Sequence, residues 1–182
     1  MTDNYTRERD HMVTWQIEKR GVTNQAVLRA MRTVPRHLFV SPEMREHAYA
    51  DYPLPIGNGQ TISQPYIVAL MTSLLNLDGT ETMLEVGTGS GYQAAVLSLI
   101  AREVHTVEFI PALALEAAAA LNNMGYANVT VHQGDGSLGW EEAAPYDAIM
   151  VTASAPKVPP PLLAQLHYEI SHDTSRPGIE RT

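Results

Sequence analysis

The sequence predicts a doubly wound α/β fold with a mostly parallel sheet. From residue 82 onward, short apolar runs alternate with helical segments, which is the pattern of parallel strands joined by right-handed crossovers. The run "AIMV" at 148–151 is wholly apolar, as expected of a strand covered on both faces. A glycine-rich turn, "GTGSG" at 87–91, joins the first predicted strand to a helix, as the tight turns of βα units do.

The part before this sheet is predicted to contain helices and a long polar loop. Apolar residues at helical spacing predict a helix over 7–20, and Thr23 is a plausible N-cap for a second helix that ends at Pro35. The stretches 34–40 and 49–66 are dense in proline and glycine. Irregular segments of this length inside a domain are often functional.

The remaining elements are expected in a regular order. A helix begins at Pro65 and reaches about Leu77, and its expected buried face is Ile67, Leu70, Met71, Leu74 and Leu75. Strands are predicted at 82–87, 103–109, 128–134 and 146–154. Helices are predicted at 91–101, 111–125 and 159–166.

The length of 182 residues fits one domain with a sizeable core. We expect this domain to span 1–166, with N-terminal helices and the polar loop in 1–78 and the α/β part in 79–166. The last residues, 167–182, show no apolar alternation and carry several charges, so we expect a poorly ordered tail.

Composition excludes several classes of function. The net charge is −8 and lysine and arginine form no run, which argues against a nucleic-acid partner. Cysteine is absent and the histidines lack ligand spacing, so no metal site is expected. The N-terminus lacks the apolar core of a signal peptide, and no apolar stretch reaches 18 residues. We therefore expect a cytoplasmic protein with no membrane partner.

The glycine-rich turn allows three interpretations. It could be a tight βα turn that binds nothing. A dinucleotide would require the fingerprint G-x-G-x-x-G, but its sixth position is Tyr92, whose side chain is bulky where close packing is needed. S-adenosylmethionine carries a cationic sulfonium and no pyrophosphate, so its pocket should be rich in acids.

Acidic residues lie at the carboxyl ends of three successive predicted strands. Glu85 precedes the glycine turn, Glu108 closes the second strand, and Asp135 follows the third. Parallel strands place their carboxyl ends along one edge, where ligands bind. There, Glu108 could accept hydrogen bonds from both ribose hydroxyls and Asp135 could accept one from an adenine amino group. These acids favour S-adenosylmethionine.

The motifs "LEVGTGSG", "TVEF", "QGDGS" and "YDAIMVTAS" resemble those of class I methyltransferases that use S-adenosylmethionine. The resemblance implies a Rossmann-like sheet and S-adenosyl-L-homocysteine as product. The residues that it implies around the cofactor are Glu85, Gly87, Thr88, Gly89, Gly91, Glu108, Phe109, Gly134, Asp135 and Gly136.

The segment "PIGNGQTISQPY", with "VPRHLFV" before it, resembles the active-site segment of protein-L-isoaspartate O-methyltransferases. The resemblance runs from about Thr23 to Leu166. It implies that Ser63, with Thr61 and Gln60 beside it, belongs to the active site; Ser63 as a helix cap is the alternative. It also implies methylation of the α-carboxylate of L-isoaspartyl residues, and more weakly of D-aspartyl residues, in damaged proteins and peptides, which starts their repair. A carboxylate is ionised at neutral pH, so this chemistry needs no strong base.

The resemblance ends after Leu166, where the family continues with a Gly-Gly turn and three more strands. We therefore expect a C-terminally truncated member in which the fourth strand lies at a sheet edge, with self-association as one way to cover it. Three other functions remain open: a class I methyltransferase for a small molecule or another peptide, a catalytically impaired protein that binds S-adenosylmethionine, and, last, an NAD enzyme.

Overall fold

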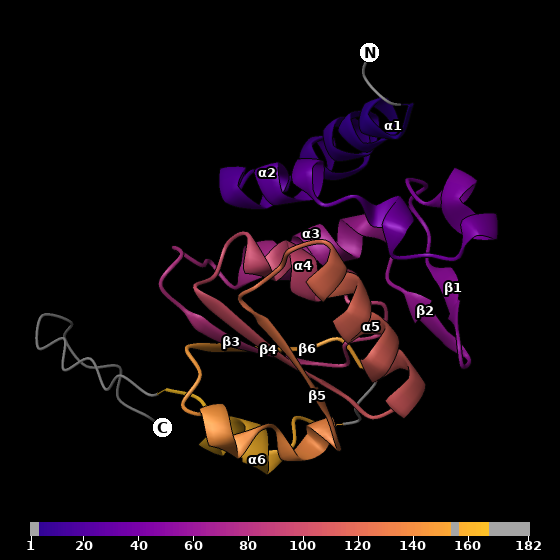
Figure 1. Ribbon diagram of the computed structural model, residues 1–182. Helices are drawn as coiled ribbons and strands as arrows, with labels where there is room; N and C mark the ends of the chain where they lie inside the picture. Colours follow the sequence, from indigo (N-terminus) through magenta and orange to yellow (C-terminus); the bar gives the residue numbers. More distant parts are fainter. Residues whose placement is uncertain (1–3, 154–156, 168–182) are drawn as a thin grey trace, which may run out of the picture.

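A four-stranded parallel sheet lies at the centre of the computed structural model, which describes residues 4–153 and 157–167 (Figure 1). The strands are β3 (Thr82–Val86), β4 (Glu103–Glu108), β5 (Val129–Gln133) and β6 (Ala148–Val151). Their order is β5-β4-β3-β6, and every neighbouring pair is parallel. The doubly wound α/β fold predicted from the sequence is confirmed.

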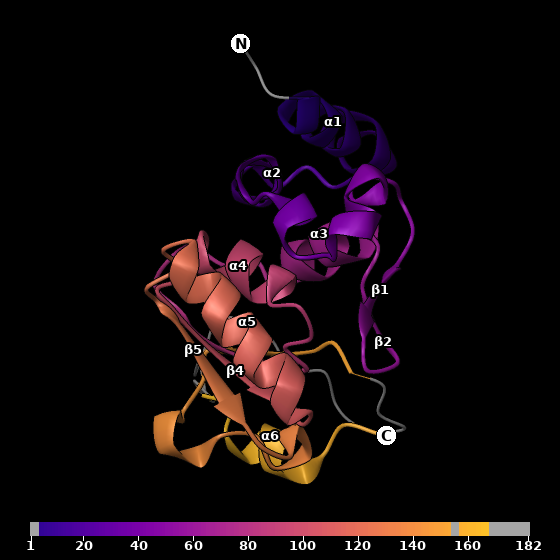
Figure 2. The same ribbon diagram turned by 45° about the vertical axis from the view of Figure 1, so that its right-hand side comes forward.

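Helices cover both faces of this sheet (Figures 1 and 2). On one face lie α4 (Tyr92–Ser98) and α5 (Pro111–Asn123). On the other lies α6 (Pro160–Ala164), with the 3₁₀ turns Gly136–Leu138 and Glu141–Ala143. Because side chains alternate along a strand, Met83 packs in the larger core beneath α4, whereas Leu84 packs in a smaller core with Leu162 of α6.

Burial differs between the central and outer strands. All five residues of β3 are buried, but in β6 only Met150 is. The prediction that 148–151 is covered on both faces is therefore wrong, because β6 lies at an edge of the described sheet. That edge position was itself expected from the sequence. Self-association through this edge stays a prediction.

The N-terminal part packs as a helical layer above the sheet (Figure 1). Helix α1 (Asn4–Met12) continues through a π-helical turn, Val13–Ile17, and a 3₁₀ turn, Glu18–Arg20. Helix α2 spans Gln25–Thr33. Its cap is Asn24, whose side chain accepts hydrogen bonds from the N–H groups of Ala26 and Val27, so Thr23 was the wrong cap by one residue.

Helix α3 (Pro65–Leu74) starts where predicted and ends three residues earlier. Its buried residues are Pro65, Val68, Ala69 and Thr72, whereas Leu74 is 74% exposed and Ile67 is exposed as well. The predicted face was therefore wrong for those two, because the helix docks on α2 through smaller side chains than the sequence suggested.

The polar loop contains structure that the sequence did not predict. After the 3₁₀ turns Arg36–Leu38 and Pro42–His47, strands β1 (Leu54–Gly57) and β2 (Gln60–Ile62) form an antiparallel hairpin. Gly57 and Gly59 at its turn have φ angles of 89° and 69°, which glycine adopts without strain. The hairpin carries its last residues toward the carboxyl ends of the strands.

The predicted poorly ordered tail at 167–182 lies outside the described residues except for His167, and its order stays a prediction. No helix within 4–153 and 157–167 combines the length and apolar character needed to cross a membrane.

Candidate functional site

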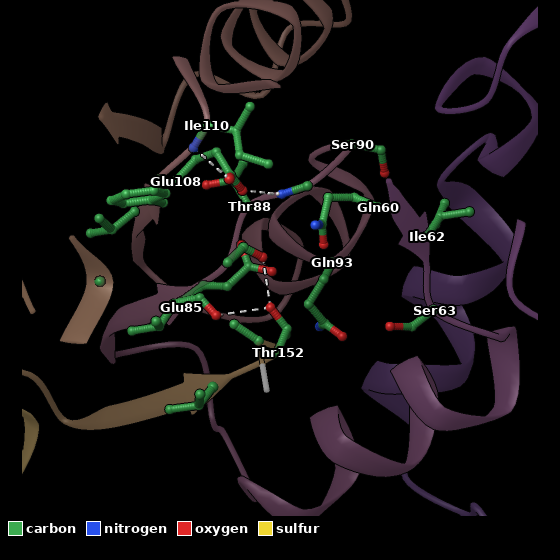
Figure 3. Close-up of a pocket in the computed structure, with 18 of the residues that line it drawn as sticks. Gln60, Ile62, Ser63, Glu85, Thr88, Ser90, Gln93, Glu108, Ile110 and Thr152 are labelled. Atoms are coloured by element: carbon green, nitrogen blue, oxygen red, sulfur yellow. Dashed lines mark hydrogen bonds between the residues drawn. The ribbon is translucent and has the colours of Figure 1, made fainter. Parts of the chain in front are cut away.

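A cavity of about 380 Å³ opens at the carboxyl ends of β3, β4 and β6 (Figure 3). It has two walls of different origin. The strand-end wall consists of Glu85, Gly87, Thr88, Gly89, Glu108, Phe109, Asp135 and Gly136. The hairpin wall consists of Gln60, Thr61, Ile62 and Ser63. The structure thus brings together 11 of the 13 predicted site residues, from segments more than 70 residues apart.

The two predicted residues that do not line the cavity are Gly91 and Gly134. Gly91 begins α4 with a φ of 85°, and a Cβ there would lie 3.1 Å from Leu121 of α5. The backbone N–H of Gly134 donates to the carbonyl of Glu108. Both glycines therefore shape the chain behind the wall, and their predicted contact with the cofactor stays a prediction.

Gly87 makes the turn that begins the strand-end wall. Its φ is 99°, and a Cβ on it would lie 2.8 Å from the Thr152 hydroxyl oxygen, which follows β6. That hydroxyl donates to the carbonyl of Gly87 at 2.6 Å and lies beside the carbonyl of Val86 at 2.9 Å (Figure 3). Any side chain at 87 would push these two strand ends apart.

Glu108 is fixed by backbone hydrogen bonds at both carboxylate oxygens (Figure 3). Oε2 accepts from the N–H of Gly89 at 2.8 Å, and Oε1 accepts from the N–H of Ile110 at 3.0 Å. A carboxylate has about four acceptor positions, so each oxygen can still accept a hydrogen bond from a ligand. Glu108 is therefore oriented before any ligand arrives.

Glu85 is fully buried on the floor of the cavity. Its Oε2 accepts from the hydroxyl of Thr106 at 2.7 Å, and the Thr106 hydroxyl oxygen in turn accepts from the Thr88 hydroxyl at 2.7 Å. Its Oε1 is buried without a partner in the part of the chain that the structure describes. Burial raises the pKa of Glu85 to about 8; the Thr106 hydrogen bond opposes this shift and the charge of Glu108 adds to it. A ligand that brings a hydrogen-bond donor to Oε1 would remove a substantial desolvation cost.

Asp135 stands at the rim of the strand-end wall. Its Oδ1 accepts from the N–H of Ser137 at 2.9 Å, and hydrogen bonds from the side chain and backbone of Ser137 hold the pKa of Asp135 below its usual value. Gly136 beside it packs closely, because a Cβ there would lie 2.5 Å from Cγ1 of Val86. Asp135 is therefore ionised and exposed at the cavity mouth.

The hairpin wall is built from side chains on a short, exposed element. Gln60 and Thr61 are exposed, and Ser63 is half-buried and points into the cavity (Figure 3). The N-cap of α3 is Gln64, and within residues 4–153 and 157–167 the Ser63 hydroxyl accepts no capping hydrogen bond from a backbone N–H. The alternative of Ser63 as a helix cap is thus not what the geometry shows.

Sequence reasoning missed several cavity residues, notably Gln93, Thr152 and Ile110. Gln93 lies in the first turn of α4, directly after the glycine turn, and this position was the only signal available. Thr152 follows the last strand as Asp135 follows the third, so its strand-end position could have marked it. Within the described residues, no three His, Cys, Asp or Glu side chains group as metal ligands would.

The arrangement suits a cationic or donor-rich ligand along the strand-end wall and an anionic group near the hairpin wall. Acceptors line the first, namely two buried carboxylates and the rim carboxylate of Asp135. Hydroxyl donors line the second, from Thr61 and Ser63. The cavity thus offers different chemistry to a cation and to an anion on its two sides.

Comparisons with known proteins agree with one another. A family model described as Protein-L-isoaspartate(D-aspartate) O-methyltransferase matches residues 7–168. Protein-L-isoaspartate O-methyltransferase 1 of Syntrophobacter fumaroxidans (strain DSM 10017 / MPOB) is 56% identical over 163 residues, which are 90% of this chain and 76% of that protein.

Two solved structures share the fold. A protein-L-isoaspartate O-methyltransferase superposes with a TM-score of 0.78 at 31% identity, over 87% of this chain and 52% of that one, so this chain spans about half of its length. A Plasmodium falciparum structure in complex with S-adenosyl-L-homocysteine has a TM-score of 0.74 at 24% identity, over 87% of this chain and 79% of that chain.

Proposed function

Because the chain belongs to the protein-L-isoaspartate(D-aspartate) O-methyltransferase family, we propose that it methylates the α-carboxylate of L-isoaspartyl residues in damaged proteins. D-Aspartyl residues are weaker substrates, S-adenosylmethionine is the methyl donor, and S-adenosyl-L-homocysteine is the product. The observation that carries this proposal is the single cavity in which Ser63 lies opposite Glu85 and Glu108.

The residues of the strand-end wall fit this cofactor. When bound, S-adenosylmethionine supplies a methyl group activated by the sulfonium centre. Glu108 has acceptor positions left for the two ribose hydroxyls, and Asp135 for the adenine amino group. The unpartnered Oε1 of Glu85 offers an acceptor to the cofactor's ammonium group. A bound cation would also favour the ionised form of Glu85, whose pKa is raised by burial.

The hairpin wall fits the second substrate. The isoaspartyl carboxylate is ionised near neutral pH, so the reaction requires positioning more than proton removal. The Ser63 hydroxyl donates a hydrogen bond to one carboxylate oxygen and leaves the other free to attack the methyl carbon. Thr61 and Gln60 line the same wall and limit how the substrate peptide enters.

Two measurements test this proposal. Labelled methyl transfer to an isoaspartyl peptide is compared with transfer to the same peptide containing aspartate, and S-adenosyl-L-homocysteine binding is measured by calorimetry. We expect transfer to the isoaspartyl peptide alone. Binding without transfer would indicate a catalytically impaired cofactor-binding protein. Equal transfer to both peptides would indicate a methyltransferase for another carboxylate.

A further inference from the structure

Gln93 lines the cavity between the strand-end wall and the hairpin wall. It lies in the first turn of α4, and its side chain is only 8% exposed. Its amide nitrogen Nε2 donates to the Thr72 hydroxyl oxygen of α3 at 2.9 Å. Its amide oxygen is not among the buried oxygens without a partner, so a molecule in the cavity can reach it.

The orientation of this amide follows from the hydrogen bonds of Thr72. The Thr72 hydroxyl donates its one proton to the carbonyl of Val68 at 2.8 Å. Its oxygen can therefore only accept from Gln93, which requires the NH₂ group of Gln93 to face Thr72. The amide oxygen Oε1 is consequently turned away from α3 and toward the cavity.

Ser63 and Gln93 point toward each other across the cavity (Figure 3). Ser63 brings a hydroxyl donor, and Gln93 brings an acceptor whose direction is fixed by Thr72. In the described part of the chain no hydrogen bond joins these two side chains, so both groups can serve a molecule between them. Such a molecule must carry an acceptor and a donor a short distance apart.

We propose that Oε1 of Gln93 accepts the amide N–H of the isoaspartyl residue itself, while Ser63 donates to its α-carboxylate. This inference rests on the proposed function. In an isoaspartyl residue the amide nitrogen and the carboxylate are attached to the same carbon. In an aspartyl residue one CH₂ group separates them further, so the same two contacts cannot form together. Gln93 and Ser63 thereby favour the isoaspartyl residue over aspartyl residues of either configuration, which agrees with D-aspartyl residues being the weaker substrates.

The test pairs a change in the protein with a change in the peptide. The protein variant is Gln93→Leu, which keeps the volume and removes the acceptor. The peptide analogue carries a methyl group on the isoaspartyl amide nitrogen, which removes the donor. For the unaltered protein we expect the analogue to raise KM about tenfold, because one buried hydrogen bond is lost.

For Gln93→Leu we expect KM for the ordinary isoaspartyl peptide to rise about tenfold, with kcat and the Kd of S-adenosyl-L-homocysteine within about twofold. The N-methyl analogue should then raise KM no further, since the contact is already gone. An additional rise of the same size in the variant would overturn the proposal. A weakened Kd for S-adenosyl-L-homocysteine would overturn it too, because Gln93 would then serve the cofactor.

Thr72 provides a second test that does not touch the substrate, because it lies outside the cavity lining. Thr72→Val releases the Gln93 amide and should raise KM for the isoaspartyl peptide about threefold, and Thr72→Ser should restore it. The melting temperature of each variant distinguishes this positioning role from a loss of folding. If Thr72→Val has the melting temperature and the KM of the unaltered protein, the proposal is contradicted.

The proposed function fails separately, if the unaltered protein transfers no methyl group to the isoaspartyl peptide. In that case the affinity of the ordinary and the N-methyl peptide is measured instead, for the unaltered protein and for Gln93→Leu. Both proteins are saturated with S-adenosyl-L-homocysteine. A loss of affinity with Gln93→Leu that N-methylation does not increase supports the contact, and equal affinity throughout overturns it.

Discussion

The two walls of the cavity are held in place in different ways. In the strand-end wall, Glu108 is bonded at both oxygens to backbone N–H groups and Glu85 is bonded to Thr106. In the hairpin wall, Gln60 and Thr61 are exposed, and the side chain of Ser63 makes no hydrogen bond within the described residues. Buried hydrogen bonds hold the side chains of one wall, whereas the polar side chains of the other wall are left to contact a ligand.

This difference indicates how the two ligands are recognised. A preorganised wall binds without ordering cost, which suits a cofactor common to every reaction cycle. A wall of exposed side chains can adapt to peptides of different sequence, and only Ser63 and the fixed amide of Gln93 need to be constant. Changes in the strand-end wall should therefore affect cofactor binding and stability, and changes in the hairpin wall should affect the peptide alone.

The largest effect is expected at Glu85. Its pKa is raised to about 8 from a value near 4.5 in the unfolded chain, so the folded protein holds the proton more tightly. The resulting stability is fully present below pH 4.5 and is lost as the pH rises toward 8. Glu85→Gln should be more stable than the parent at pH 8, on the order of 4 kcal/mol, and lose that advantage toward pH 4.5.

This difference is measured by denaturant unfolding of both proteins from pH 4.5 to 8.5. Glu116→Gln, an exposed change on α5, should run parallel to the parent at every pH. A constant offset between Glu85→Gln and the parent would show that Glu85 does not titrate in this range.

The next effect is on the cofactor. Glu108→Ala removes the acceptor of both proposed ribose hydrogen bonds, so the Kd of S-adenosyl-L-homocysteine should rise about 100-fold, near 3 kcal/mol. Glu108→Gln keeps one acceptor oxygen, so its Kd for S-adenosyl-L-homocysteine should lie between those of the parent and the alanine variant. Calorimetry measures all three. An unchanged Kd for Glu108→Ala would show that Glu108 does not bind the ribose hydroxyls.

Packing behind the strand-end wall is tested by two neighbouring glycines. A Cβ at Gly136 would lie 2.5 Å from Val86, whereas one at Gly134 would meet its neighbours at 3.8 Å. Gly136→Ala should therefore lower the free energy of unfolding by about 2 kcal/mol, and Gly134→Ala by much less. Adding Val86→Ala should recover part of the loss in Gly136→Ala. Equal destabilisation by both single variants would contradict the steric reason.

The smallest effect belongs to the hairpin wall. Ser63→Ala should lower kcat/KM for the isoaspartyl peptide about tenfold, because one hydrogen bond to the carboxylate is lost. The Kd of S-adenosyl-L-homocysteine should stay unchanged, unlike in Glu108→Ala. Ser73→Ala on α3, whose hydroxyl donates to Leu70 outside the cavity, is the matched control. A change in cofactor affinity with Ser63→Ala would contradict the assignment of the hairpin wall to the peptide alone.

The strand-end wall could be predicted from sequence because its signals are local. Each strand is a short apolar run, each acid lies at or just after the carboxyl end of its strand, and the glycine turn precedes a helix. Parallel strands bring these ends together without further information. Even here, the local pattern could not tell that Gly91 and Gly134 lie behind the wall, because their neighbours Leu121 and Trp140 come from elsewhere in the chain.

The hairpin wall could not be predicted in the same way. Strands β1 and β2 are only four and three residues long, too short for a periodic pattern, and they exist because they pair with each other. The cap of α2 was missed by one residue because Thr23 and Asn24 are both cap-forming residues, and local hydrogen bonds selected Asn24. The buried face of α3 was predicted wrongly at Ile67 and Leu74 because contacts with α2, and not periodicity alone, decided the rotation of this helix.

The sequence by itself determined the parallel sheet, the glycine turn and the row of acids at its edge, because strand propensity and residue spacing are properties of neighbours along the chain. Only the tertiary structure decided that Ser63 faces Gln93, that Thr72 fixes the direction of that amide, and that Glu85 keeps a buried oxygen without a partner. These three facts depend on distances between α3, α4 and the sheet, and such distances are set by the packing of the folded chain.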